Sequence, residues 1–69
     1  MSDIKRIVLV VNQEINPSQV TRFVARSSKI TGLIEDDLGV RVTIDSGNGL
    51  AQTIYVENSF DEVAEFMIN

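Results

Sequence analysis

The sequence predicts a single small α+β domain over residues 1–69, with the element order β-α-β-β-α. Three observations lead to this fold class: an apolar, β-branched run near the N-terminus, a helix-start signature after it, and two alternating segments around a glycine-rich turn. The chain has no Cys and no His. It therefore lacks the residues that build zinc sites, disulfides and thiol or imidazole catalytic sites.

The first strand is expected over residues 4–11 (IKRIVLVV). These residues are β-branched and almost continuously apolar from Ile7 onward, which is typical of a strand covered on both faces. The run ends at Val11, and it is far shorter than the roughly 18 residues that a membrane-spanning helix needs. No signal-peptide cleavage pattern follows it. We therefore expect a soluble, cytoplasmic protein that does not bind membranes.

A helix is expected over residues 17–31. Asn16 is a favourable N-cap, Pro17 takes the first helical position, and Gln19 stands where a capping box has Glu or Gln. Gly32 is expected to end the helix. The helix would turn one side to the core, with apolar or small side chains at helical spacing: Val20, Phe23, Val24, Ser27 and Ile30.

Residues 33–38 are expected to form a link that carries an acidic patch. The next segment alternates apolar and polar side chains from Val40 to Asp45, and residues 50–56 alternate in the same way. Alternation of this kind predicts two half-buried strands. The Ser-Gly-Asn-Gly sequence between them predicts a hairpin.

The apolar pattern also predicts the register of this hairpin. A two-residue turn at Asn48-Gly49 would set the apolar face of one strand against the polar face of the other. A three-residue turn at residues 47–49 instead pairs Val42 with Ile54 on one face and Arg41 with Tyr55 on the other. The three-residue turn is therefore expected, with Gly49 in the left-handed conformation.

The last helix is expected to start at a capping box formed by Ser59 and Glu62. Three strands with both helices on one face would resemble a ferredoxin-like fold that lacks its last strand. In that arrangement the first strand pairs with the strand over residues 50–56 and keeps one edge exposed. A bare apolar edge is a liability that proteins cover.

The charge is distributed unevenly along the chain. Residues 1–32 carry five basic and two acidic residues, a net +3, whereas residues 33–69 carry one basic and eight acidic residues, a net −7. Arg22, Arg26 and Lys29 would share one face of the expected helix. This face is interpreted first as solvated, with anion or nucleic-acid binding as the alternative. An isoelectric point of 4.5 disfavours nucleic acid.

The acidic segments do not match a metal site. Asp45 starts a segment that resembles a calcium loop, but glycines occupy its third and fifth positions and a valine its twelfth. No nucleophile has a base at a recognisable spacing. We therefore expect a non-enzymatic protein without metal or cofactor.

The leading functional hypothesis is a protein–protein interaction module. It would form a homodimer or bind another protein through the apolar first strand and the open sheet face, with contact residues Ile7, Leu9, Val11, Arg41 and Tyr55. The alternatives are anion or nucleic-acid binding through the basic helix face, and a small acidic protein that acts as an inhibitor or decoy.

Overall fold

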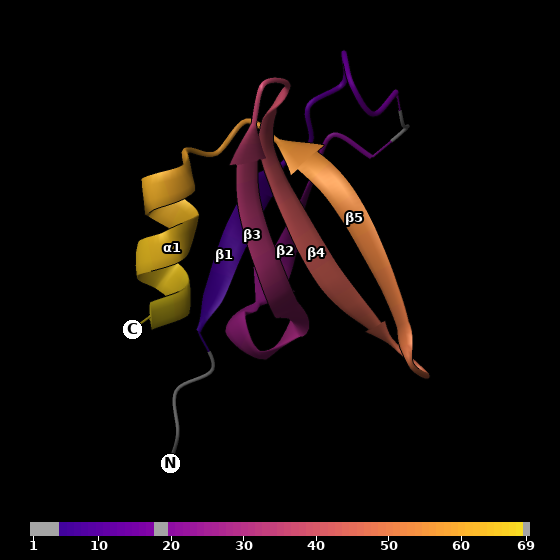
Figure 1. Cartoon of the computed structure of the whole chain (residues 1–69). Helices are drawn as coiled ribbons and strands as arrows, with labels where there is room; N and C mark the ends of the chain where they lie inside the picture. The colour runs from indigo at the N-terminus through magenta and orange to yellow at the C-terminus, as the bar shows by residue number, and fades with distance from the viewer. Residues whose placement is uncertain (1–4, 18–19, 69) are drawn as a thin grey trace.

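The computed structural model describes residues 5–17 and 20–68, which form two antiparallel β-sheets and one C-terminal α-helix (Figure 1). The first sheet contains β1 (Arg6–Val10) and β2 (Arg22–Arg26). The second contains β3 (Ile30–Asp36), β4 (Gly39–Gly47) and β5 (Leu50–Val56). A short 3₁₀ helix, η1 (Ser27–Lys29), connects β2 to β3, and α1 (Phe60–Ile68) follows β5.

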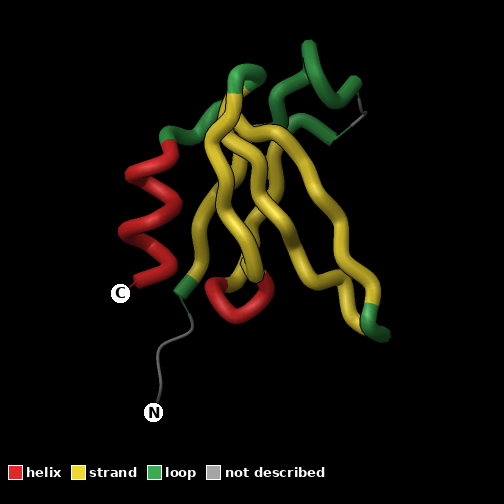
Figure 2. Tube along the Cα trace, viewed as in Figure 1, coloured by secondary structure: helices red, strands yellow, loops and turns green. Residues whose placement is uncertain are grey.

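The two sheets lie one behind the other and join at one corner (Figure 2). There Val11 forms an antiparallel bridge with Val56. Two backbone hydrogen bonds make this bridge: Asn12 N–H donates to the Tyr55 carbonyl (2.9 Å) and Glu57 N–H donates to the Val10 carbonyl (2.8 Å). The end of β1 is thus fixed to the end of β5.

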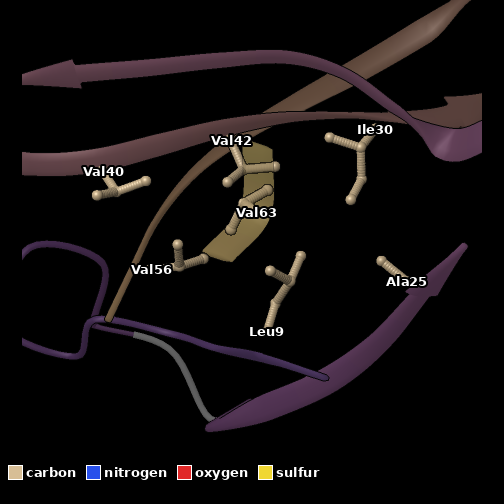
Figure 3. Close-up of a cluster of buried hydrophobic side chains, with 7 residues drawn as sticks. All are labelled: Leu9, Ala25, Ile30, Val40, Val42, Val56 and Val63. Atoms are coloured by element: carbon tan, nitrogen blue, oxygen red, sulfur yellow. The ribbon is translucent and has the colours of Figure 1, made fainter. Parts of the chain in front are cut away.

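The core lies between the sheets and is closed at one side by α1 (Figure 3). Leu9 of β1, Val42 of β4 and Val63 of α1 are completely buried. Burial of one such side chain contributes roughly 1.5–3 kcal/mol. The remaining buried members come from both sheets: Ala25, Ile30, Val40 and Val56.

The predicted β-α-β-β-α order, the three-stranded sheet with two helices and the ferredoxin-like architecture are wrong. Residues 22–36 form β2, η1 and β3 instead of the greater part of a helix over 17–31. The local pattern explains this outcome: Phe23 and Ala25 face the core, whereas Val24 and the arginines beside it are exposed. This is alternation with a period of two, and Val and Thr favour strands over helices.

The predicted helix-start residues serve another purpose. The Asn16 side-chain oxygen accepts a hydrogen bond from Tyr55 N–H (2.8 Å) and so ties the loop after β1 to β5 instead of capping a helix. Residue Ile4 of the predicted first strand and Gln19 of the predicted capping box lie outside the described residues.

The predicted acidic link over residues 33–38 is also wrong, because most of it belongs to β3. Asp37 and Leu38 alone form the turn between β3 and β4, in which Asp36 pairs with Gly39. The predicted pairing of the first strand with residues 50–56 is limited to the Val11–Val56 bridge. The full length of β1 pairs with β2.

The predicted β4–β5 register is confirmed: Val42 pairs with Ile54 and Arg41 with Tyr55. The turn itself differs from the prediction. Asn48 (φ 55°) and Gly49 (φ 75°) form a two-residue turn with both residues left-handed. A bulge between Asp45 and Gly47 inserts one extra residue into β4. The bulge restores the register that the two-residue turn would otherwise have shifted.

The predicted last helix is confirmed as α1. The Ser59 hydroxyl accepts a hydrogen bond from Glu62 N–H (3.1 Å), as an N-cap should. Val63 faces the core, while Asp61, Glu62 and Glu65 are exposed. No helix within residues 5–17 and 20–68 is long and apolar enough to cross a membrane.

Candidate functional site

The residues predicted for an interface on the first strand face inward. Leu9 and Val11 are buried, and Ile7 is partly buried against the same core. They contact other parts of the same chain, so a partner could reach them only if the sheets separated. The exposed side chains of β1 are the alternate ones, Arg6, Val8 and Val10.

The edge of β1 that does not face β2 is covered by Asn58. The Asn58 side chain accepts a hydrogen bond from Val10 N–H (2.9 Å) and donates one to the Val8 carbonyl (2.9 Å). It also donates to the Glu62 carboxylate (3.0 Å). The amide of Asn58 therefore takes the place of a neighbouring strand at Val8 and Val10, and it blocks strand addition at this part of the edge.

Arg41 and Tyr55, the other predicted contact residues, pair across β4 and β5 on the outer face of the second sheet. The Tyr55 hydroxyl donates to the Asp36 carboxylate (2.6 Å). This hydrogen bond holds the pKa of Asp36 below its ordinary value and raises the pKa of Tyr55 above its own. The structure thus gives these residues a role within the fold.

The arginines predicted to share a helix face share a strand face instead. On the outer side of the first sheet Arg6 lies opposite Arg26, Val8 opposite Val24, and Val10 opposite Arg22. All six side chains are exposed, and we refer to them as the arginine–valine face. Lys29 is separate from it, on η1.

The opposite side of β2 opens onto an apolar groove between the sheets. Its larger part has a volume of about 610 Å³ and is lined by residues of the loop after β1, of β2 and of the β4–β5 hairpin, among them Phe23, Ile44 and Ile54. A second part of about 320 Å³ lies between residues 23–26 of β2 and residues 44–46 of β4. Phe23 and Ile44 line both parts, so the hollow follows β2 along its length.

Within the described residues, the backbone of β2 has hydrogen-bonding groups along this groove that pair with no neighbouring strand. Val11 N–H donates to the Thr21 carbonyl (2.8 Å) and Ser27 N–H donates to the Lys5 carbonyl (3.1 Å), one at each end of the β1–β2 ladder. Hydrogen-bonded positions alternate in an antiparallel ladder. The N–H and C=O groups of Arg22, Val24 and Arg26 therefore point away from β1, and within the described residues β2 pairs with no other strand.

The acidic segments are used in turns. The Asp36 carboxylate accepts hydrogen bonds from Leu38 N–H (2.9 Å) and Gly39 N–H (3.2 Å), and Asp45 accepts one from Gly47 N–H (2.9 Å). In the described part of the chain no three acidic side chains gather as a metal site would require. These interactions explain the acidic residues by turn formation.

Sequence reasoning missed β2 and the groove beside it. The alternation of Phe23 and Ala25 with the two arginines was the available signal, but Val24 on the outer face obscured it because it also fits a helical apolar stripe. Comparison with protein-family models, curated proteins and solved structures finds no match for this chain. The geometry of the groove is therefore the basis for inferring a function.

Proposed function

We propose that this protein is a protein-interaction module that binds an extended segment of a partner by strand addition to β2. The observation that carries the proposal is that an open strand edge lies next to an apolar groove. The first sheet has two strands and faces a sheet of three, so the inner side of the β4–β5 hairpin is covered incompletely. One more strand beside β2 would cover it.

Two features of the structure support strand addition at β2. The N–H and C=O groups of alternate β2 residues supply main-chain hydrogen bonds, which give affinity. Phe23, Ile44 and Ile54 line the hollow into which every second side chain of the added strand would point. The expected interaction through a strand edge is thus retained as a proposal, with β2 in place of β1.

A second copy of this chain is a poor occupant of the β2 edge. Two-fold antiparallel pairing of β2 with itself along its full length would set Arg22 of one copy against Arg26 of the other, twice. Like charges directly opposite each other destabilise a strand pair. Proteins use charged edges of this kind to prevent self-association. We therefore favour a different protein as the partner, in a reducing compartment such as the cytoplasm, with which the absence of Cys is compatible.

The proposal is tested by removing one edge N–H. Val24→Pro deletes a donor that points away from β1, so the β1–β2 ladder stays intact and the fold is expected to be retained. A library of displayed random peptides would be selected for binding to the native protein. The affinity of each selected peptide would then be measured by calorimetry. Selected peptides are expected to shift the amide resonances of Arg22, Val24 and Arg26, and to lose binding by about tenfold or more with Val24→Pro, equivalent to one or two main-chain hydrogen bonds.

Val24→Ala is the matched control, because it shortens the same side chain and keeps the N–H group. Arg22→Pro removes the neighbouring outward donor and replaces Val24→Pro should that variant fail to fold. Peptides that bind Val24→Pro, Val24→Ala and the native chain equally would contradict strand addition at β2, as would a selection that enriches no peptide.

A further inference from the structure

The arginine–valine face lies directly beside the β2 edge and restricts what can bind there. Neither β1 nor β2 contains an acidic residue. Arg6 and Arg26 lie opposite each other across the two strands, where like charges oppose one another. An anionic side chain placed next to Arg26 would relieve this repulsion.

An added strand would bring its outward side chains into line with those of β2. Its residues opposite Arg22, Val24 and Arg26 would point to the arginine–valine face, and the two residues between them would point into the groove. Charge complementarity requires acidic residues opposite the arginines. The apolar side chain of Val24 requires an apolar residue opposite it. The groove, lined by Phe23 and Ile44, requires apolar residues at the two inward positions.

Resting on the proposed function, we infer that the partner segment is acidic at both ends and apolar between them, in the order acidic–apolar–apolar–apolar–acidic. This order holds for either direction of the added strand because it is symmetric. The chain itself contains no such segment, which again points to a partner that is not a second copy.

The test compares peptides that differ only in end charge. Capped peptides would carry Glu-Val-Leu-Val-Glu, Gln-Val-Leu-Val-Gln or Lys-Val-Leu-Val-Lys between Ser-Gly flanks, and a single-stranded oligonucleotide of random sequence would serve as a polyanion without the alternation. The Glu peptide is expected to bind about tenfold more tightly than the Gln peptide at low salt, from two cross-strand ion pairs. The difference is expected to shrink at high salt because exposed charges are screened.

Charge reversal supplies the matched control. Arg22→Glu combined with Arg26→Glu is expected to reverse the preference, so that the Lys peptide binds best. This variant should fold, since it replaces the Arg6–Arg26 repulsion with an attraction.

The outcomes separate this inference from the proposed function. Equal binding of the Glu and Gln peptides, abolished by Val24→Pro, would overturn the charge inference and leave strand addition standing. No binding by any of the three peptides would overturn the charge inference, and failure of the display selection as well would overturn strand addition. If the protein bound the oligonucleotide more tightly than the peptides, and Val24→Pro did not change this binding, both the charge inference and strand addition would be overturned in favour of nucleic-acid binding.

Discussion

Asp36 organises the turn between β3 and β4 and links it to β5. One carboxylate oxygen accepts the N–H groups of Leu38 and Gly39, and the other accepts the Tyr55 hydroxyl at 2.6 Å. The turn also brings Gly39 under the Tyr55 ring: a Cβ added at Gly39 would lie 3.9 Å from the ring. One exposed carboxylate thus connects three strands.

Replacement of Tyr55 by Phe is expected to raise the pKa of Asp36 toward its ordinary 3.8, because the Tyr55 hydrogen bond is the largest cause of its lowering. In the native chain the ionised Asp36 stabilises the fold at pH values above its ordinary pKa, and this stabilisation is lost as the pH falls through the lowered pKa.

Tyr55 gives the opposite pH dependence. Its pKa is raised above 10.0, so its stabilisation of the fold is complete at pH values below 10.0 and is lost as the pH rises through the raised pKa.

Carboxyl carbon NMR titration of Asp36 in the native chain and in Tyr55→Phe checks this prediction. Thr53→Ala is a suitable control, since it changes a neighbouring side chain of the same strand face and leaves the Tyr55–Asp36 hydrogen bond in place. An Asp36 titration that is identical in native and Tyr55→Phe protein would show that the hydrogen bond does not hold the carboxylate in solution.

At the scale of elements, the two edges of the first sheet are treated differently. At the β1 edge the side chain of the buried Asn58 blocks strand addition beside Val8 and Val10, because its amide hydrogen-bonds to the Val8 carbonyl and the Val10 N–H. The β2 edge has no equivalent among the described residues. On the proposed function, this open edge is the point of contact with a partner.

Asn58→Ala is expected to lower the free energy of unfolding by about 2 kcal/mol, because it leaves two backbone groups of β1 without their partners. Urea unfolding followed by circular dichroism measures the change. Glu62→Gln is the matched control: it retains an oxygen to accept the Asn58 amide and is expected to cost much less. An Asn58→Ala variant as stable as the native chain would mean that water replaces the amide at this edge without loss.

Elements whose apolar residues follow one spacing, that of a strand or that of a helix, were predictable from the sequence. Elements whose apolar residues fit both spacings were not. β4, β5 and their register followed from strict alternation, and α1 followed from the Ser59 cap. For β2, Val24 fits both a helical stripe and an exposed strand position, and Asn16-Pro17 imitates a helix start. Tertiary contacts favour the strand over the helix here, since the Asn16 side chain accepts a hydrogen bond from Tyr55 N–H of β5 instead of capping a helix.

The open strand edge was predicted at the wrong strand. The sequence led to a free edge on the first strand, through a three-stranded sheet order that the structure contradicts. The continuous apolar run of β1 could not show which side faces the core, since Val8 and Val10 are as apolar as Leu9 and Val11. The structure places Leu9 and Val11 inside and leaves β2, a strand that the sequence did not predict, at the open edge.

At the scale of the whole molecule, the two sides of the β-sandwich are unequal. α1 lies along β1 and β3 at one side and inserts Val63 into the core (Figures 1 and 3). At the other side the groove between β2 and the β4–β5 hairpin has no covering helix within the described residues. The fold therefore assigns stability to one side and, on the proposed function, binding to the other.

Two substitutions, one on each side, should separate these contributions. Val63→Ala removes a fully buried side chain from the α1 side, and it is expected to lower the free energy of unfolding by about 2 kcal/mol without changing the affinity of the folded protein for a selected peptide. Ile44→Ala removes part of the groove lining, so it is expected to weaken peptide binding several-fold, with a smaller loss of stability because Ile44 is only partly buried. Urea unfolding and calorimetry on the same samples give both quantities. If Val63→Ala weakened the peptide as much as Ile44→Ala did, the groove would not be a separate binding side, and the division of the sandwich into a closed and an open side would have no functional meaning.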